Sequence, residues 1–171
     1  KIQLNGFKSF SEKTTFLIEE GLTGIVGPNG CGKSNIVESL RWCMGETSAK
    51  SMRGSGMEDV IFSGTSNKPS KNIAEVSINI SNPEKSGSFQ FKEIEEIEIR
   101  RKIERDKGSR FYLNDKEVRA KDAQMFFADL STGAHSPSII SQGRIGSLVT
   151  AKPQDRRAIL EEAAGISGLH A

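Results

Sequence analysis

Eight consecutive residues near the N-terminus have the types and spacing of a phosphate-binding loop. The run from Gly27 to Ser34 matches the pattern G-x-x-x-x-G-K-[S/T]. Its glycines leave the backbone uncovered, so successive N–H groups can point inward at a polyanion. Lys33 adds a positive charge for the β and γ phosphates, and Ser34 offers a hydroxyl to Mg²⁺. We therefore expect ATP and Mg²⁺ to be bound by Gly27, Pro28, Asn29, Gly30, Cys31, Gly32, Lys33 and Ser34.

Two other interpretations concern the same loop. A glycine-rich turn that merely caps a helix would leave Lys33 and Ser34 without a purpose, so we disfavour it. Cys31 is either a redox-sensitive thiol, because thiols at helix N-termini can be reactive, or a small loop residue without special reactivity. The chain has only two cysteines, which argues against a disulfide scaffold and suits a reducing cytosol.

The segments on either side of the loop predict the elements that hold it in place. Leu22–Val26 is a short apolar run bounded by glycines, which indicates a buried strand. Residues 33–44 change to helical spacing, and Gly45 is a plausible helix stop. Upstream, residues 2–6 and 14–18 predict two further strands. The expected apolar face of the helix consists of Ile36, Val37, Leu40 and Met44.

The middle of the chain predicts an antiparallel meander with one buried and one solvated face. Residues 74–80 alternate apolar and polar side chains, and residues 97–103 do so again. The alternation continues through Phe111 and Leu113, between turns at Lys107-Gly108 and Asn114-Asp115. Residues 121–130 and 153–164 return to helical spacing.

Length and composition favour one α/β domain. The chain has 171 residues, of which 35% are hydrophobic and 27% charged, enough apolar residues for a core. No apolar run approaches 18 residues, and the N-terminal segment lacks the apolar core of a signal peptide, so we expect no contact with a membrane. The fold class predicted is a P-loop NTPase with a mixed sheet around the phosphate loop and an antiparallel β lobe.

Positive charge is concentrated in residues 100–121. This segment has nine basic and four acidic side chains, a net charge of +5, which leaves −3 for the rest of a chain whose total is +2. An anionic partner would explain this asymmetry, and so would a solvated hairpin with ordinary Lys and Arg. Charge alone leaves both interpretations open.

Parts that a complete NTPase needs are missing from the pattern. Hydrolysis requires an acidic residue at a strand end for Mg²⁺ and a group that activates water. Met125–Asp129 superficially resembles such a strand, and residues 130–134 (LSTGA) resemble a signature motif, but both lie in helical spacing that ends in glycine. We therefore expect half of an active site, able to hold nucleotide and unable to finish hydrolysis alone.

Short stretches along nearly the whole chain match one family in the order of that family. They are residues 6–10 (GFKSF), 24–30 (GIVGPNG), 48–54 (SAKSMRG), 57–62 (MEDVIF), 141–144 (SQGR), 156–157 (RR) and 161–166 (EEAAGI). On these stretches the chain resembles the N-terminal half of the ABC-type ATPase head of bacterial structural maintenance of chromosomes (SMC) proteins.

The resemblance implies roles for individual residues. Gln142 is similar to the family's Q-loop glutamine, which reaches Mg²⁺ and the attacking water. Arg53 is similar to an arginine that approaches the nucleotide and influences DNA-stimulated turnover, and Lys8 to a residue near the nucleotide. Arg119 and Lys121 match basic positions that grip DNA. One departure is Gly56, where relatives often have lysine, which puts one DNA contact in doubt.

The family also implies a function and partners. Two heads would form a dimer around ATP through the full-length protein, each completed by the signature motif of the other, to drive DNA binding, chromosome condensation and segregation. Partners would be DNA, bound regardless of sequence, and a kleisin subunit, and the location would be the cytoplasm at the nucleoid. Residues 1–171 would be the N-terminal part of the head, with 153–171 leading toward a coiled coil. Alternatives are a DNA-repair ATPase of the same clade, a P-loop kinase and a purely structural DNA-binding module.

Overall fold

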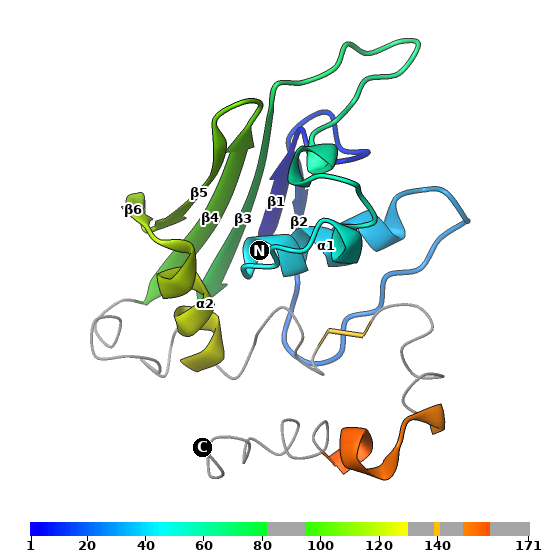
Figure 1. The fold of residues 1–171 in the computed structure, drawn as a ribbon, viewed down its shortest axis with the longest axis vertical. Coiled ribbons are helices and arrows are strands. Elements are labelled where there is room, and N and C mark those ends of the chain that lie inside the picture. The colour runs from blue at the N-terminus through cyan, green and yellow to red at the C-terminus, as the bar shows by residue number, and fades with distance from the viewer. Residues whose placement is uncertain (82–94, 130–138, 141–148, 158–171) are drawn as a thin grey trace.

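The computed structural model describes residues 1–81, 95–129, 139–140 and 149–157. Within them the strands form a six-stranded antiparallel sheet in the order β2-β1-β3-β4-β5-β6, with helices α1 and α2 beside it (Figure 1). The strands are β1 (Ile2–Asn5), β2 (Thr14–Phe16), β3 (Ile73–Ser81), β4 (Glu96–Glu104), β5 (Gly108–Leu113) and β6 (Lys116–Val118). The helices are α1 (Lys33–Cys43), α2 (Ala120–Asp129) and the short 3₁₀ helices η1 (Lys50–Met52) and η2 (Met57–Val60).

Alternating apolar residues build the buried face of the sheet. Ile78 of β3 pairs with Ile2 of β1 on one side and with Ile99 of β4 on the other, so one buried row crosses three strands. All three side chains are less than 10% exposed. The predicted meander is confirmed, including its turns, because period-two alternation suits a sheet with one covered face.

Both helices cover this same face. Trp42 and Cys43 of α1 and Phe126 and Phe127 of α2 belong to one core cluster with the inward residues of β1, β3 and β4. The boundaries of α1 agree with the prediction, and Gly45 follows it at φ 102°, a conformation that favours glycine. Of its predicted apolar face, Ile36 and Met44 are buried and Leu40 packs against the core, whereas Val37 is only half-buried. The buried residues of α1 are Ile36, Glu38, Ser39, Trp42 and Cys43.

The strand predicted at residues 22–26 is absent from the structure. These residues are irregular, and the side chains of Leu22 and Val26 are 99% and 92% exposed. A strand needs a neighbour to pair its backbone groups, and no strand among the described residues pairs with this segment. All strand pairs in the described part of the chain are antiparallel, so these residues form the antiparallel lobe and no mixed sheet.

The later helices agree with the prediction where the structure describes them. Residues 121–130 were expected to be helical, and α2 covers most of that range. Asp129 is the last residue of α2, so the apolar run before it is helical and not a strand leading to a metal-binding acid. Residues 153–157 are helical, and the remainder of the helix expected at 153–164 lies outside the described residues.

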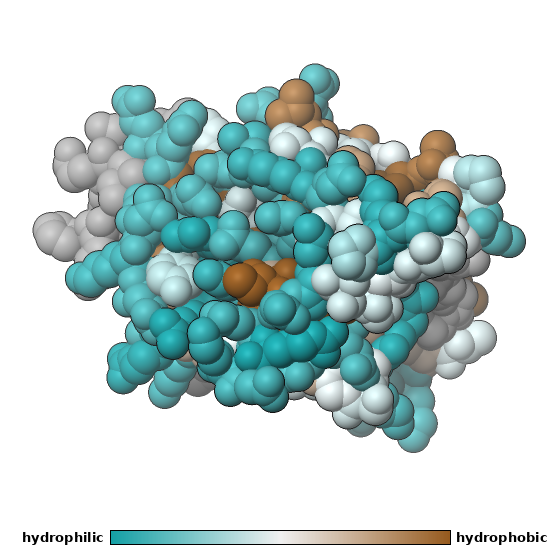
Figure 2. All heavy atoms as spheres, turned by 90° about the horizontal axis from the view of Figure 1, so that it is seen from above, coloured by the Kyte–Doolittle hydropathy of each residue, from teal (hydrophilic) through white to brown (hydrophobic). Residues whose placement is uncertain are grey.

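The surface is largely hydrophilic on the side seen in Figure 2, with small hydrophobic areas between the polar side chains. In the described part of the chain, no helix has the length and apolar character needed to cross a membrane.

Candidate phosphate-binding site

The phosphate loop leads directly into the first turn of α1. Gly32 is the N-cap of this helix and has φ 94°, which side chains rarely adopt. A Cβ atom at Gly32 would also lie 2.9 Å from the Ser9 hydroxyl oxygen. The second glycine of the motif is therefore required by backbone conformation and by its neighbour, and it brings the helix N-terminus to the loop.

Lys33 is enclosed by the loop that precedes it. Its ammonium group donates to the backbone oxygen of Gly27 at 2.6 Å and to that of Pro28. The positive end of the α1 dipole is at the same place, because Lys33 is the first residue of the helix. A full charge and a helix N-terminus at one loop are the arrangement that binds phosphate.

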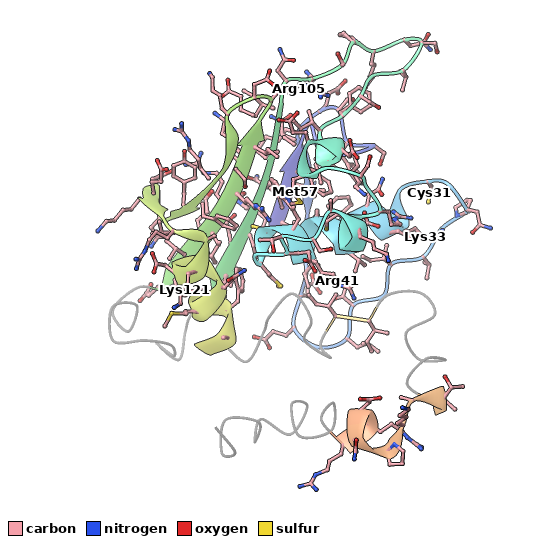
Figure 3. All side chains as sticks on the ribbon, in the orientation of Figure 1. Cys31, Lys33, Arg41, Met57, Arg105 and Lys121 are labelled. Atoms are coloured by element: carbon pink, nitrogen blue, oxygen red, sulfur yellow. The ribbon has the colours of Figure 1, made fainter. Side chains whose placement is uncertain are left out.

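Two more loop residues have defined surroundings. Cys31 is exposed, with its sulfur 4.0 Å from the Lys33 ammonium nitrogen. Figure 3 shows both residues at the same edge of the molecule. Ser34 is exposed in the first turn of α1, where its hydroxyl is available to a cation bound with phosphate. Among the described residues, no group of three or more His, Cys, Asp or Glu could hold a metal ion.

A polar network joins three segments beside this loop. Ser9 accepts a 2.9 Å hydrogen bond from the Asn35 side-chain amide, and the Asn35 oxygen accepts a 2.9 Å bond from Arg53. Arg53 also forms an ion pair with Glu38, and Glu38 forms a second ion pair with Lys8. The structure thus brings Lys8 and Arg53, both predicted site residues, to the helix that carries Lys33.

Sequence reasoning missed the residues that link these predicted ones. Asn35 and Glu38 lie one helical turn apart on α1, directly after the phosphate motif, and Ser9 follows Lys8. The available signal was Glu38, a charged residue four positions before Trp42 and therefore on the same side of the helix as that large apolar side chain. It is 6% exposed, which for a carboxylate requires partners.

Gln142, the residue expected to reach Mg²⁺ and water, lies outside the described residues. Its position relative to the loop therefore stays a prediction, as does that of the surrounding residues 141–144.

The basic segment 100–121 carries less free charge than its composition suggests. Arg101 is buried, Arg100 pairs with Asp115 at 2.8 Å, and Lys107 pairs with Glu104 at 2.7 Å. Much of the charge that suggested an anionic partner therefore has a partner within the domain.

Arg119 and Lys121 lie at the other side of the molecule from the phosphate loop. Both are exposed, and Arg119 pairs with Asp122 through two bonds of 2.9 and 3.0 Å. Asp122 thereby has a pKa below its ordinary value. An open groove of about 530 Å³ is lined here by Arg110, Lys116 and Arg119. In Figure 3 the labelled Lys121 and Lys33 stand far apart.

Comparisons with known proteins agree on one family. Residues 1–143 match the family model of the RecF/RecN/SMC N terminal domain. The chromosome partition protein Smc of Cereibacter sphaeroides is 56% identical over 170 residues, which are 99% of this chain and 15% of that protein. The chain therefore spans about 15% of the length of this curated relative.

Solved structures give the same result. One similar solved structure comes from work on the ATP-driven dimerization and DNA-stimulated activation of SMC ATPases. It has a TM-score of 0.81 and 30% sequence identity to this chain, and the match covers 95% of this chain and 96% of that one. An Smc head bound to the C-terminal winged-helix domain of ScpA has a TM-score of 0.85 and 32% identity, covering 96% of this chain and 50% of that one. The predicted fold class, the P-loop ATPase head, is thereby confirmed.

Proposed function

Because the chain belongs to the RecF/RecN/SMC N terminal domain family, as the N-terminal half of an SMC-type ATPase head, we propose that it is the nucleotide-binding half of a head that dimerises around ATP. The observation that carries this proposal is the loop from Gly27 to Ser34, closed around the Lys33 ammonium at the N-terminus of α1. Residues 1–171 form the N-terminal part of the head in this proposal, and 153–171 lead toward a coiled coil.

The residues of the chain have distinct tasks in the proposed site. Backbone N–H groups of residues 29–34 bind the phosphates, and the Lys33 ammonium exchanges its two carbonyl partners for phosphate oxygens. Ser34 and Gln142 hold Mg²⁺, which when bound neutralises phosphate charge and polarises the phosphoryl oxygens. Arg53 and Lys8 add positive charge from loops that pack beside α1.

Head engagement completes this half-site. A nucleotide held by one head presents its γ-phosphate to the signature motif of a second head, so binding joins two surfaces and hydrolysis separates them. The similar structure described under ATP-driven dimerization supports this part of the proposal. The whole protein then binds DNA for chromosome condensation and segregation, in the cytoplasm at the nucleoid, with a kleisin subunit as partner. The ScpA-bound Smc head supports the kleisin.

Arg119 and Lys121 are the proposed DNA contacts. Their exposure beside the groove of β5, β6 and α2 makes them available to phosphates, although Arg119 must first exchange Asp122 for DNA. Contacts to phosphates ignore base sequence and weaken with salt. Replacing Lys121 with alanine should lower the slope of log affinity against log salt by about one and weaken all sequences equally.

The central test uses Lys33→Ala in the intact protein. Calorimetric titration with Mg-ATP should show binding to the wild type and a loss of at least about a hundredfold in the variant, since a charge within the phosphate site is removed. Lys13→Ala, an exposed lysine outside the loop, is the matched control. Absence of a heat signal from folded wild-type protein at millimolar Mg-ATP would refute the proposal.

A second measurement tests the half-site. The isolated 171-residue chain should bind Mg-ATP weakly and release no phosphate. Steady-state phosphate release that disappears in Lys33→Ala would show that the chain is a complete ATPase. The repair ATPase and the P-loop kinase are not favoured, because the relative with high identity is a chromosome partition protein.

A further inference from the structure

One buried carboxylate in this domain serves two cations. The Glu38 side chain is 8% exposed and forms ion pairs with both Lys8 and Arg53. Lys8 comes from the segment after β1, Arg53 from the end of η1, and Glu38 from the second turn of α1. These three side chains carry a net charge of +1, and the carboxylate of Asp59 also lies close enough to Lys8 to interact with it electrostatically.

The two cations are held with unequal firmness. The Lys8 side chain is only 13% exposed, and its ammonium also donates to the backbone oxygen of Met52. Its own backbone N–H donates to Val60 at 2.7 Å, which fixes the start of the side chain. The Arg53 side chain is 59% exposed, so water can replace its partners Asn35 and Glu38 more readily than it can replace those of Lys8.

Arg53 is also placed at the phosphate end of the helix. Its guanidinium donates to Asn35 at 2.9 Å, and Asn35 directly follows Ser34 in the first turn of α1. An exposed, always charged group beside a phosphate loop is suited to bind the nucleotide. Movement of the guanidinium toward the nucleotide draws it away from Glu38, and a buried carboxylate without a cation is strongly disfavoured.

The second cation removes this obstacle. We propose that Glu38 positions Arg53 beside the phosphate loop, and that Lys8 is the permanent counter-ion that allows Arg53 to leave Glu38 for the nucleotide. This inference rests on the proposed nucleotide site and deepens it. Lys8 then acts through Arg53 and touches no phosphate itself, which differs from the direct nucleotide contact suggested by the family resemblance.

A double-mutant cycle on the intact protein distinguishes the two roles of Lys8. Mg-ATP affinity is measured by calorimetry for the wild type, Lys8→Met, Arg53→Ala and the double variant. Lys8→Met leaves Arg53 as the only cation of Glu38, so affinity should fall about tenfold because Arg53 is retained there. On the proposal, the double variant binds no more weakly than Arg53→Ala alone. Losses that multiply would overturn it, because they would indicate a direct contact of Lys8 with nucleotide.

A rescue experiment separates the release of Arg53 from a direct contact of Lys8 with nucleotide. In Lys8→Met combined with Glu38→Gln, the carboxylate that retains Arg53 is gone while Asn35 still accepts a bond from Arg53, so affinity should exceed that of Lys8→Met alone by at least about threefold. A lost contact between Lys8 and nucleotide would not be restored by neutralising Glu38, so failure of the rescue would also overturn the proposal. If Lys8→Met does not fold, as judged by circular dichroism, Lys8→Gln enters the same cycle, because its amide can still donate to Met52.

The outcomes separate this inference from the proposed function. Wild-type protein that binds Mg-ATP and loses it in Lys33→Ala confirms the site whatever the cycle shows. Wild-type protein that binds no nucleotide overturns both.

Discussion

The end of α1 far from the phosphate loop is held by a buried arginine, and removing its charge should loosen that end selectively. The Arg101 guanidinium donates to the backbone oxygens of Trp42 and Glu46 and to the Ser109 hydroxyl, each at 2.7 Å. It lies between the rings of Trp42 and Phe111, 4.5 and 4.6 Å from their centroids. The perturbation is Arg101→Met, which keeps the apolar stem between the rings.

The expected effect follows from these contacts. The Glu46 backbone oxygen loses its bond from the guanidinium, at about 1–3 kcal/mol, whereas the Trp42 oxygen keeps its bond from the Gly45 N–H, and the contact of the cation with the rings adds about 0.5–2 kcal/mol. Burial reduces the stabilisation that the guanidinium gives to the wild type, because burial disfavours the charged form and lowers the pKa of Arg101 to about 10. We expect the free energy of local opening at the C-terminal turn of α1 to fall by about 3 kcal/mol, which raises the opening equilibrium by a factor of roughly a hundred.

Hydrogen exchange measured by mass spectrometry is the appropriate assay, because it reports local opening within the intact protein. Peptides that contain the C-terminal turn of α1 should exchange about a hundredfold faster in Arg101→Met. Peptides from β1 should change little. Lys102→Met, the next residue of β4 and on the opposite face of the sheet, is the matched control and should exchange like the wild type.

Exchange within threefold of the wild type in the C-terminal turn of α1 would refute this reasoning. It would mean that water replaces the hydrogen bonds of the guanidinium to the two carbonyls without cost. Arg101 would then not stabilise this end of α1.

Other changes have equally specific outcomes. In Gly6→Ala the new Cβ would lie 2.3 Å from a backbone oxygen of β3 at φ 64°, so thermal unfolding should show a loss of about 2 kcal/mol or more; Gly108→Ala, at φ 76° with nothing within 4 Å, should lose clearly less. Asp59 accepts backbone N–H bonds that hold its pKa below the ordinary 3.8, so its contribution to stability is present near neutral pH and lost as the pH falls through the folded-state pKa. The melting temperature of Asp59→Asn should therefore lie below that of the wild type at pH 7, and a gap that stays constant down to pH 3 would contradict this assignment. A thiol reagent at pH 8 should label exposed Cys31 at least about a hundredfold faster than Cys43, whose pKa burial raises to about 12, and equal rates in the folded protein would exclude the described packing.

The elements that sequence predicted well are those whose pattern is local. The alternation of residues 74–80 and 97–103 records one covered face, and the sheet confirms it. The phosphate motif likewise required only that Gly32 begin a helix, and it does.

Two features depended on distant parts of the chain and were therefore missed. Arg101 occupies an inward position of β4, which in sequence looks like a break in the apolar alternation, because its partners are 55 and 59 residues away. Glu38 was overlooked on α1 for the same reason, since its partners are 30 and 15 residues away in the sequence.

The wrong prediction at residues 22–26 has a different cause. An apolar run between glycines indicates that a segment is covered in the complete protein, and it does not say which part of the protein covers it. The described residues offer no strand beside Val26, so the hydrophobicity of this segment has no partner among them.

That exposed apolar stretch has a consequence for how a cell makes the protein. Leu17, Leu22 and Val26 are 75%, 99% and 92% exposed in this fold. If their cover belongs to a part of the protein synthesised later, the stretch stays open while translation proceeds at about 5–20 residues per second. During that interval it is an attractive binding site for chaperones that hold short apolar segments of nascent chains, and we expect such help to be needed on the way to the mature head.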